Sequence, residues 1–246
     1  MPIDDYLGNL EQMQQNSNQN KLDTSIPSDK LKNYIILEGK LHGTYSYPDI
    51  LVPLSRTHYG NPFYQIHTML QKEQSFLLTM RQYVDFLKIL ESRSVFYGDG
   101  SKVEYSTIEK LLVDIKEPKH VPRGEWLDAV LSRKKNEDYI IFHQFENKKL
   151  VEKTVELEFK TLKDCHNKRI SYQEWIIKSN DQGLPEYDIS PGSLGYSFSC
   201  FASQPKCLRI IIFPEDSSIL KDGGLFLGVY PLAVSSMGLR AAKLKV

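Results

Sequence analysis

The sequence has little cysteine and no long apolar run. Its three cysteines, Cys165, Cys200 and Cys207, argue against a disulfide framework and fit a reducing compartment. No apolar stretch approaches the ~20 residues that span a bilayer, so we expect no membrane insertion. The first residues, MPIDDYLGNLEQ, carry acids where a secretory signal needs a basic start, which predicts a cytoplasmic or virion-associated protein.

An excess of charge of either sign is also missing. Lys+Arg and Asp+Glu both number 31, so the formal net charge is zero and no overall field attracts nucleic acid or an acidic membrane. The short basic run Arg133-Lys134-Lys135 is best interpreted as a solvated hairpin tip, because a nucleic-acid patch would need further basic or aromatic neighbours. We therefore predict no nucleic-acid partner.

Motifs that mark common metal and enzyme sites are absent from the sequence. It has no Cys-x-x-Cys or His-x-x-x-His spacing, no G-x-S-x-G elbow and no Gly-rich phosphate loop after a strand. We predict no metal, no cofactor and no catalytic residue, although a Ser/His/Asp triad assembled from distant segments leaves no such signature. The scattered histidines are each expected to be loop or surface residues rather than ligands: His42, His58, His67, His120, His143 and His166.

The N-terminal residues 1–31 are predicted to form a flexible polar tail before a single domain at residues 32–246. The centre of the tail, QMQQNSNQN, is too polar to bury enough surface to order itself. The alternative is an assembly arm, in which Tyr6, Leu10 and Met13 dock on a partner.

Capped amphipathic helices are predicted at several points of the domain. Thr79 and Gln82 form a capping box, and an apolar stripe of Met80, Val84, Leu87 and Leu90 follows up to Glu91. A helix at residues 60–73 precedes this one, with Phe63, Ile66 and Leu70 on one face. Two more capping boxes, Ser106 with Glu109 and Ser171 with Glu174, predict a third helix and a short helix Tyr172–Lys178.

Strands are predicted before and after these helices. Lys32–Leu41 is the first, and Tyr47–Leu54 is expected at a sheet edge because it contains two prolines. Because strands are grouped rather than alternating with helices, the pattern predicts an α+β fold. The later strands are an antiparallel meander, Trp126–Arg133, Asp138–Phe145 and Leu150–Leu162, and a final group, Tyr196–Phe201, Cys207–Phe213, Leu225–Pro231 and Met237–Lys243.

Several short sequence segments, called phrases below, follow one another in a characteristic order. They are Asp49–Pro53, the Leu77–Leu87 capping box, Glu125–Ala129, Trp175, Gln182–Pro185, the aromatic stretch Tyr196–Phe201 and a closing strand of the G-F-R-x-A kind. Together they resemble the archaeal variable proteins diversified by diversity-generating retroelements, over roughly residues 34–246. That family adopts the C-type lectin fold of the formylglycine-generating-enzyme type, which implies that the first and last strands meet.

The family's L-P-T-x-x-E-W box and its closing motif are matched only in part. In the box, Leu78 replaces the proline, Gln82 the glutamate and Tyr83 the tryptophan. Two segments fit the closing motif, Leu227–Pro231 and Met237–Ala242, and the second is favoured because it keeps an arginine, Arg240.

The resemblance implies a non-enzymatic ligand-binding protein that recognises an unidentified protein or cell-surface ligand through its C-terminal part. Tyr, Ser and Asp suit this role, since Tyr offers rigid amphipathic area and the others adaptable hydrogen bonds. A competing interpretation is that the apolar triplet Ile210–Ile212 is a buried strand and Ser217-Ser218 a turn. The corresponding positions are Tyr196, Ser197, Phe198, Arg209, Ile211, Phe213, Glu215, Asp216 and Ser217.

Two other function classes stay open. Enzymes of this fold bind copper through a cysteine pair near the C-terminus, and Cys200 with Cys207 is the only candidate for a copper-dependent thiol oxidase. The six residues between these cysteines do not fit the family's pair, so small core residues are the simpler interpretation. The third class is a structural component of a virus or cell surface, with the tail mediating assembly.

Overall fold

The computed structural model describes residues 26–43, 45–61, 63–116, 124–134, 137–146, 149–156, 168–185, 189–192, 194–197, 208–215, 224–230 and 237–245. The helical elements are η1 (Ser28–Asn33), α2 (Phe63–Lys72), α3 (Met80–Ser92), α4 (Tyr105–Lys116) and α5 (Tyr172–Ile177). The strands of the N-terminal half are β1 (Tyr34–Leu37), β2 (Lys40–His42), β3 (Tyr45–Tyr47), β4 (Ile50–Pro53) and β5 (Glu125–Lys134). The later strands are β6 (Glu137–Glu146), β7 (Lys149–Glu156), β8 (Lys168–Ile170), β9 (Leu194–Ser197), β10 (Leu208–Glu215), β11 (Gly224–Tyr230) and β12 (Lys243–Leu244).

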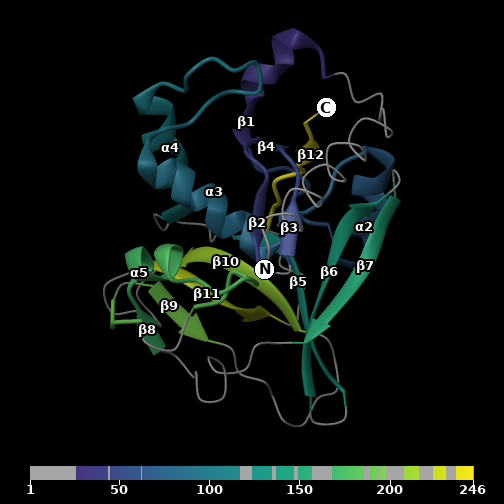
Figure 1. Ribbon diagram of the computed structural model, residues 1–246, viewed down its shortest axis with the longest axis vertical. Coiled ribbons are helices and arrows are strands. Elements are labelled where there is room, and N and C mark those ends of the chain that lie inside the picture. The colour runs from purple at the N-terminus through teal and green to yellow at the C-terminus, as the bar shows by residue number, and fades with distance from the viewer. Residues whose placement is uncertain are drawn as a thin grey trace, which may run out of the picture.

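Two β-sheets and a hairpin organise the described residues. A three-stranded sheet has the order β1-β4-β12, a seven-stranded sheet the order β7-β6-β5-β10-β11-β9-β8, and β2 pairs with β3. The small sheet lies with α3 and α4 in the upper half of Figure 1, while β8–β11 and α5 lie in the lower half. All pairs are antiparallel except β9 with β11, which confirms the predicted α+β class.

The predicted meander is confirmed over the described residues. Strands β5, β6 and β7 pair in sequence order. The last pair of β5 with β6 is Lys134 with Glu137, which places the basic run at the end of this hairpin, as predicted. The predicted third strand is described as far as Glu156, and its remainder lies outside the described residues.

The first and last strands of the domain lie in the same small sheet, as predicted, but the last strand, β12, shares only Lys243 with the predicted strand Met237–Lys243. Strand β4 separates them, with Ile35 opposite Val52 on one side and Lys243 opposite Leu51 on the other. The expectation that Tyr47–Leu54 is an edge is therefore wrong. The two prolines do not interrupt the ladder, because Pro53 is the last residue of β4 and Pro48 precedes it.

The predicted first strand, Lys32–Leu41, is broken into separate elements. Residues up to Asn33 form η1, and the chain bends after β1 at Glu38-Gly39 before β2. A Cβ on Gly39 would lie 2.8 Å from the Tyr47 carbonyl oxygen, so a side chain there would force the β2–β3 hairpin away.

Of the two candidate segments for the closing motif, residues 237–242 lie beside the small sheet and the other lies in the large sheet. Leu225–Tyr230 belongs to β11 inside the large sheet, whereas Ala242 bridges to Phe76 and Leu239 to Thr57 beside the small sheet. Met237, Leu239, Arg240 and Ala242 are all buried. The segment therefore bridges to β5 of the large sheet through Gly238 and runs into β12 of the small sheet.

Helix α3 begins as the sequence predicts. Thr79 accepts a hydrogen bond from the Gln82 backbone N–H, and the Gln82 side chain accepts one from the Thr79 backbone N–H, which completes the capping box. All four residues of the predicted apolar stripe are buried, with exposed fractions of 1% or less.

The other two capping boxes differ from prediction. Ser171 does cap α5, but the Glu174 carboxylate accepts a hydrogen bond from the Ser190 backbone N–H instead of returning to Ser171. Ser106 lies inside the first turn of α4, because the Glu104 carbonyl already accepts from Thr107 and Ile108. The helix thus starts at Tyr105, two residues before the start that a cap at Ser106 would give.

The boundary of the predicted tail at residue 31 is too late. Residues 1–25 lie outside the described residues, but η1 covers Ser28–Asn33 and is tied to the domain. The Leu31 carbonyl accepts a hydrogen bond from the Gly98 N–H, and the Asn33 carbonyl accepts one from the Leu54 N–H.

We expect deletion of residues 1–25 to leave the melting temperature nearly unchanged, because their polar sequence has little apolar surface to bury. Deletion of residues 1–33 should lower it, because the backbone hydrogen bonds of Leu31 and Asn33 are lost. Thermal melts and size-exclusion chromatography of both truncations provide the test. A change of oligomeric state in the shorter truncation would instead indicate an assembly arm.

Candidate functional site

The predicted recognition positions fall on neighbouring strands of the large sheet. Tyr196 and Ser197 end β9, and Arg209, Ile211, Phe213 and Glu215 lie along β10. Strand β11 separates the two, and its Gly228 is the register partner of both Ser197 and Ile211. The backbone therefore places these two positions in one row across the sheet, while Phe198, Asp216 and Ser217 lie outside the described residues, as do Cys165, Cys200 and Cys207.

A buried ion pair joins the closing segment to the start of β5. Arg240 Nε lies 3.2 Å from Glu125 Oε1, and both side chains are almost fully buried. Arg240 Nη1 also donates to the carbonyls of Pro53 and Leu54, and the Tyr83 hydroxyl donates to Glu125 Oε2 at 3.3 Å. Four segments that are distant in the sequence thus meet around this ion pair.

The Gln182–Pro185 phrase packs on the start of α3. Gly183 has a φ of +83°, and a Cβ there would lie 2.7 Å from the Arg81 backbone nitrogen. Its carbonyl accepts a hydrogen bond of 3.0 Å from Trp175 Nε1. On the other side of the cap, the Asp128 backbone N–H donates to the Leu78 carbonyl at 2.9 Å. The N-terminus of α3 is therefore enclosed by α5 and β5.

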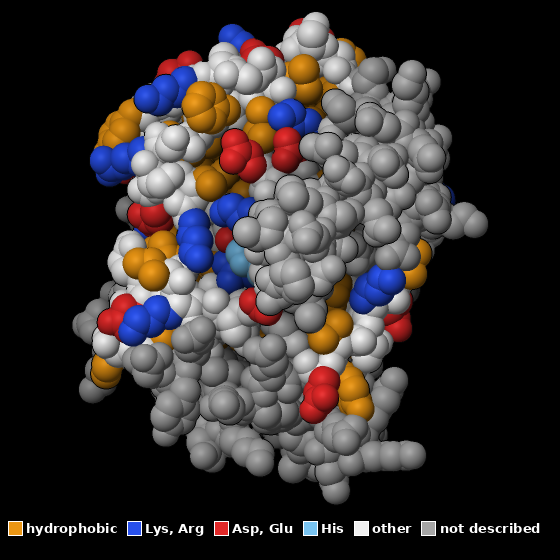
Figure 2. All heavy atoms as spheres, viewed as in Figure 1, with side chains coloured by type: hydrophobic (Ala, Val, Ile, Leu, Met, Phe, Trp, Pro, Cys, Tyr) orange, Lys and Arg blue, Asp and Glu red, His pale blue; other side chains and the backbone are white. Residues whose placement is uncertain are grey.

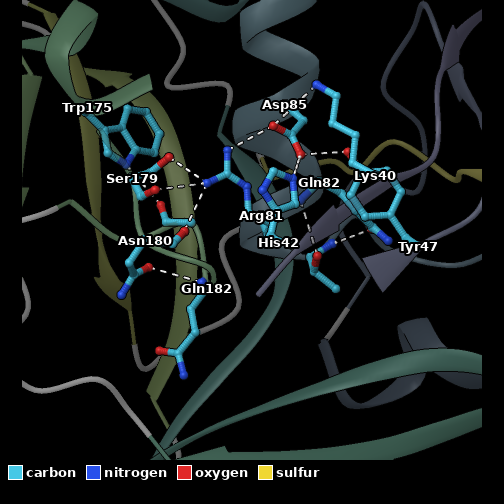
Figure 3. A network of polar contacts seen from close by, with 12 residues as sticks. Lys40, His42, Tyr47, Arg81, Gln82, Asp85, Trp175, Ser179, Asn180 and Gln182 are labelled. Carbon is cyan, nitrogen blue, oxygen red and sulfur yellow. Dashed lines mark hydrogen bonds and ion pairs between the residues drawn. The ribbon is translucent and has the colours of Figure 1, made fainter. Parts of the chain in front are cut away.

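Arg81 joins two layers of the molecule (Figure 3). Its Nη1 donates to Ser179 Oγ at 2.7 Å and to the Asn180 carbonyl at 2.9 Å, and its Nη2 donates to Asp85 Oδ1 at 2.9 Å. Arg81 is 2% exposed, and its Nε has no hydrogen-bond partner among the described residues. Arg81 therefore keeps one buried donor that a bound acceptor could use.

Asp85 is fully buried and collects four donors or cations. Besides Arg81, it accepts hydrogen bonds from the Tyr47 hydroxyl at 2.6 Å and contacts His42 Nε2 at 2.7 Å and Lys40 Nζ at 3.7 Å. Burial alone would raise the pKa of Asp85, but Arg81, Tyr47 and the other cations outweigh it and hold the pKa below its usual value. Asp85 is therefore an anion at neutral pH.

The outer side of this network carries positive charge. Figure 2 shows Lys and Arg side chains gathered around a histidine near the middle of one face, at the level where Figure 1 places α3 above the large sheet. Lys40 and His42 are only partly buried, so the network reaches the surface there.

A cavity of about 310 Å³ lies beside Arg81. Its walls come from β3, the start of α3, strands β5–β7 and the turn at residues 181–182. Two aromatic residues form one side: the Tyr45 ring meets Phe142 edge-on at 5.8 Å, and the Tyr45 hydroxyl shares a 2.6 Å hydrogen bond with Thr79. Burial raises the pKa of Tyr45 well above its ordinary value, so its hydroxyl stays neutral.

The expectation that all histidines are loop or surface residues is wrong for three of them. His42 lies in β2, His67 in α2 and His143 in β6, all partly buried and each near a buried carboxylate. Hydrophobic periodicity could not reveal this, because it identifies apolar faces and not the partners of buried acids. His58 does lie in a connecting segment, and His120 and His166 fall outside the described residues.

His67 and His143 share the carboxylate of Asp128. Burial lowers the pKa of His67, and the negative charge of Asp128 only partly opposes this. Burial also acts to lower the pKa of His143, but the hydrogen bond to Asp128 outweighs it and the pKa lies above its usual value. With their carboxylate, these two imidazoles form the group of described residues whose geometry could hold a metal ion.

The sequence interpretation missed the polar residues of α3. Arg81 and Asp85 are spaced i,i+4 with opposite charge, a pattern that usually marks an exposed helix face. The signal that could have found them is that apolar residues lie on opposite faces of the first turns of α3. A helix that is apolar on both faces is buried all round, so its charged residues are buried too.

No family model matches the sequence, and no curated protein or solved structure matches it either. Within the described part of the chain, none of the helices has the length and apolar character that a membrane crossing requires.

Proposed function

We propose that the protein is a non-enzymatic ligand-binding protein with a C-type-lectin-like fold of the formylglycine-generating-enzyme type, resembling retroelement-diversified variable proteins. The observation that carries this proposal is the convergence of the phrases behind the resemblance. Arg240 of the closing segment contacts Glu125 and the Pro53 carbonyl, and Glu125 contacts Tyr83 of the capped helix. This convergence of four of the matched positions supports the proposal.

The recognition surface in this proposal has two parts. One is the β9–β10 region, which carries the positions that the resemblance implies. The other is the cavity beside Arg81, whose volume of about 310 Å³ is near the lower end of ligand pockets, roughly 300–1,000 Å³. A space of this size suits one side chain of a protein ligand better than a whole cofactor.

The cavity also indicates which side chain it would accept. The Tyr45 and Phe142 rings provide an apolar wall, and the buried Arg81 Nε is a donor in need of an acceptor. Lys153 adds a cation to the lining. The lining also carries the carboxylates of Asp128, Glu156 and Asp181, so these features together favour a neutral amide side chain carried by a peptide segment of the partner.

A random peptide library displayed on phage and panned against the full chain tests this function. We expect enriched peptides to bind the isolated protein, and Thr154→Trp to weaken that binding at least ~10-fold, because the new ring would fill the cavity that Thr154 lines. Val113→Trp, at an exposed position of α4, is the matched control and should bind as the wild type does. Fluorescence anisotropy with the enriched peptides measures both.

The β9–β10 part is tested by Tyr196→Ala and Phe213→Ala with the same peptides. If these side chains belong to the recognition surface, affinity falls while the free energy of unfolding changes by less than about 1 kcal/mol. A loss of roughly 3–5 kcal/mol for Phe213→Ala would identify a buried strand instead.

Two results would contradict the proposal as a whole. One is that every enriched peptide binds the wild type, Thr154→Trp, Tyr196→Ala and Phe213→Ala with equal affinity. The other is copper-dependent oxidation of a cysteine peptide by the wild type that disappears in Cys200→Ser and Cys207→Ser, which would make the protein a thiol oxidase.

A further inference from the structure

Three potential metal ligands converge from three separate elements. His67 comes from α2, Asp128 from β5 and His143 from β6, and their ligand atoms all lie within 4.8 Å of one another. Asp128 Oδ1 is 3.0 Å from His143 Nδ1 and 3.6 Å from His67 Nε2. Both imidazoles thus point at the same carboxylate oxygen.

The fold fixes this convergence. The His143 backbone N–H donates to Asp128 Oδ2, which turns the other carboxylate oxygen toward the two rings. His67 follows Ile66, which is buried with Leu70 in a core cluster that includes Trp126 of β5. Helix α2 is therefore held against the strand that carries Asp128, and the imidazole rings lie 3.9 Å apart between their centroids.

The Asp128 carboxylate is buried, with the two imidazoles beside it. Its side chain is 1% exposed, and the basic groups within ion-pair distance among the described residues are these two histidines. A buried carboxylate is costly unless it is paired with positive charge. A divalent ion held between the carboxylate and the two rings would supply such a charge at this position.

The distances of the two imidazole nitrogens from Asp128 Oδ1 suit a tetrahedral ion. With bonds of about 2.0–2.2 Å, a tetrahedral Zn²⁺ site places neighbouring ligand atoms roughly 3.3–3.6 Å apart. The distances from Asp128 Oδ1, 3.0 and 3.6 Å, bracket that range and need only a small adjustment. Imidazole ligands also select against Mg²⁺ and Ca²⁺, which prefer oxygen.

We propose that His67, Asp128 and His143 form a binding site for a divalent first-row transition-metal ion, with Zn²⁺ as the expected occupant. The fourth position is taken by water or by Glu152, an exposed carboxylate that is the register partner of His143 on β7. Asp128 also lines the cavity beside Arg81, so the site adjoins an open space through which an ion can enter. The bound ion would fasten α2 to the β5–β6 hairpin.

Isothermal titration calorimetry of the full chain, stripped with EDTA and then freed of chelator, tests the site. We expect one equivalent of ZnCl₂ to bind, with no heat from MgCl₂ or CaCl₂, and the melting temperature to rise with saturating Zn²⁺ because the ion binds only the folded state. CoCl₂ should produce the visible absorption of four-coordinate Co²⁺, which reports the geometry independently.

Variants of the two histidines identify the ligands. His67→Ala and His143→Ala should each weaken Zn²⁺ binding by at least ~10-fold, since even residues that only orient a ligand cost 10–100-fold. His58→Ala is the matched control, because His58 is paired with Glu73 at 2.9 Å and lies outside the cluster. Circular dichroism of each variant verifies that it folds.

Two outcomes would overturn the proposal. One is the absence of stoichiometric Zn²⁺ and Co²⁺ binding by the wild type, which would leave a hydrogen-bonded His143–Asp128 pair beside His67. The other is full retention of binding by the folded His67→Ala, His143→Ala double variant, which would locate the ion elsewhere. Neither outcome depends on whether the protein binds peptides.

Discussion

Replacing Arg240 by methionine is expected to lower the free energy of unfolding by about 3–5 kcal/mol, the range seen when one partner of a buried ion pair is removed. The methionine leaves Glu125 buried at 2% exposure without its guanidinium, and the carbonyls of Pro53 and Leu54 lose a donor. Urea melts at neutral pH measure the loss.

The control for this variant is an exposed ion pair at the same end of the chain. Lys245 Nζ lies 3.2 Å from Asp49 Oδ2, and both side chains are about a third exposed or more. Lys245→Met should therefore cost less than about 1 kcal/mol. The double variant Arg240→Met with Glu125→Gln should lose less than the sum of the single variants, because the two residues interact directly. Additive losses would show that they do not stabilise one another.

The second large effect is expected from Asp85→Asn, which should cost about 3–5 kcal/mol at neutral pH. The substitution removes the negative charge that faces Arg81, and an amide cannot accept all of the donors that surround the carboxylate. The surrounding donors stay buried but lose an acceptor, and asparagine has nearly the same volume as aspartate, so no cavity forms. We therefore expect the free energy of unfolding to fall with little change in the urea m-value.

The pH dependence of this variant follows from the lowered pKa of Asp85. A carboxyl whose folded-state pKa lies below its unfolded value of about 3.9 stabilises the fold above that pH, and the contribution disappears as the pH falls through the folded-state pKa. The wild type should therefore lose stability below about pH 4, and Asp85→Asn should lose less over the same interval.

Urea melts from pH 2.5 to 7 compare the two proteins. Glu109→Gln is the control, because Glu109 pairs with Arg93 at the surface, at 3.1 Å. Its free energy of unfolding should fall with decreasing pH as that of the wild type does. If the wild type and Asp85→Asn lost the same free energy of unfolding as the pH falls, the assignment of a buried charge to Asp85 would be contradicted.

The sequence predicted best where the deciding interactions are local. The capping box of Thr79 and Gln82 forms as expected because it joins residues three positions apart, and the apolar stripe behind it is buried because helical periodicity selects one face. The meander β5–β7 is also local, since each strand pairs with its neighbour in sequence. Errors appeared where a distant segment competed: Glu174 bonds to Ser190 and leaves the capping box at Ser171 incomplete.

The sequence by itself therefore determined the α+β class and the positions of α3 and the meander, because each depends on short-range periodicity or composition. Only the tertiary structure decided that Arg240 pairs with Glu125, that β4 is central, and that His67 and His143 meet at Asp128. These outcomes depend on which buried charges find partners across the molecule. No local pattern contains that information, because the free energy of a buried charge is set by groups that the fold, and not the chain, brings near it.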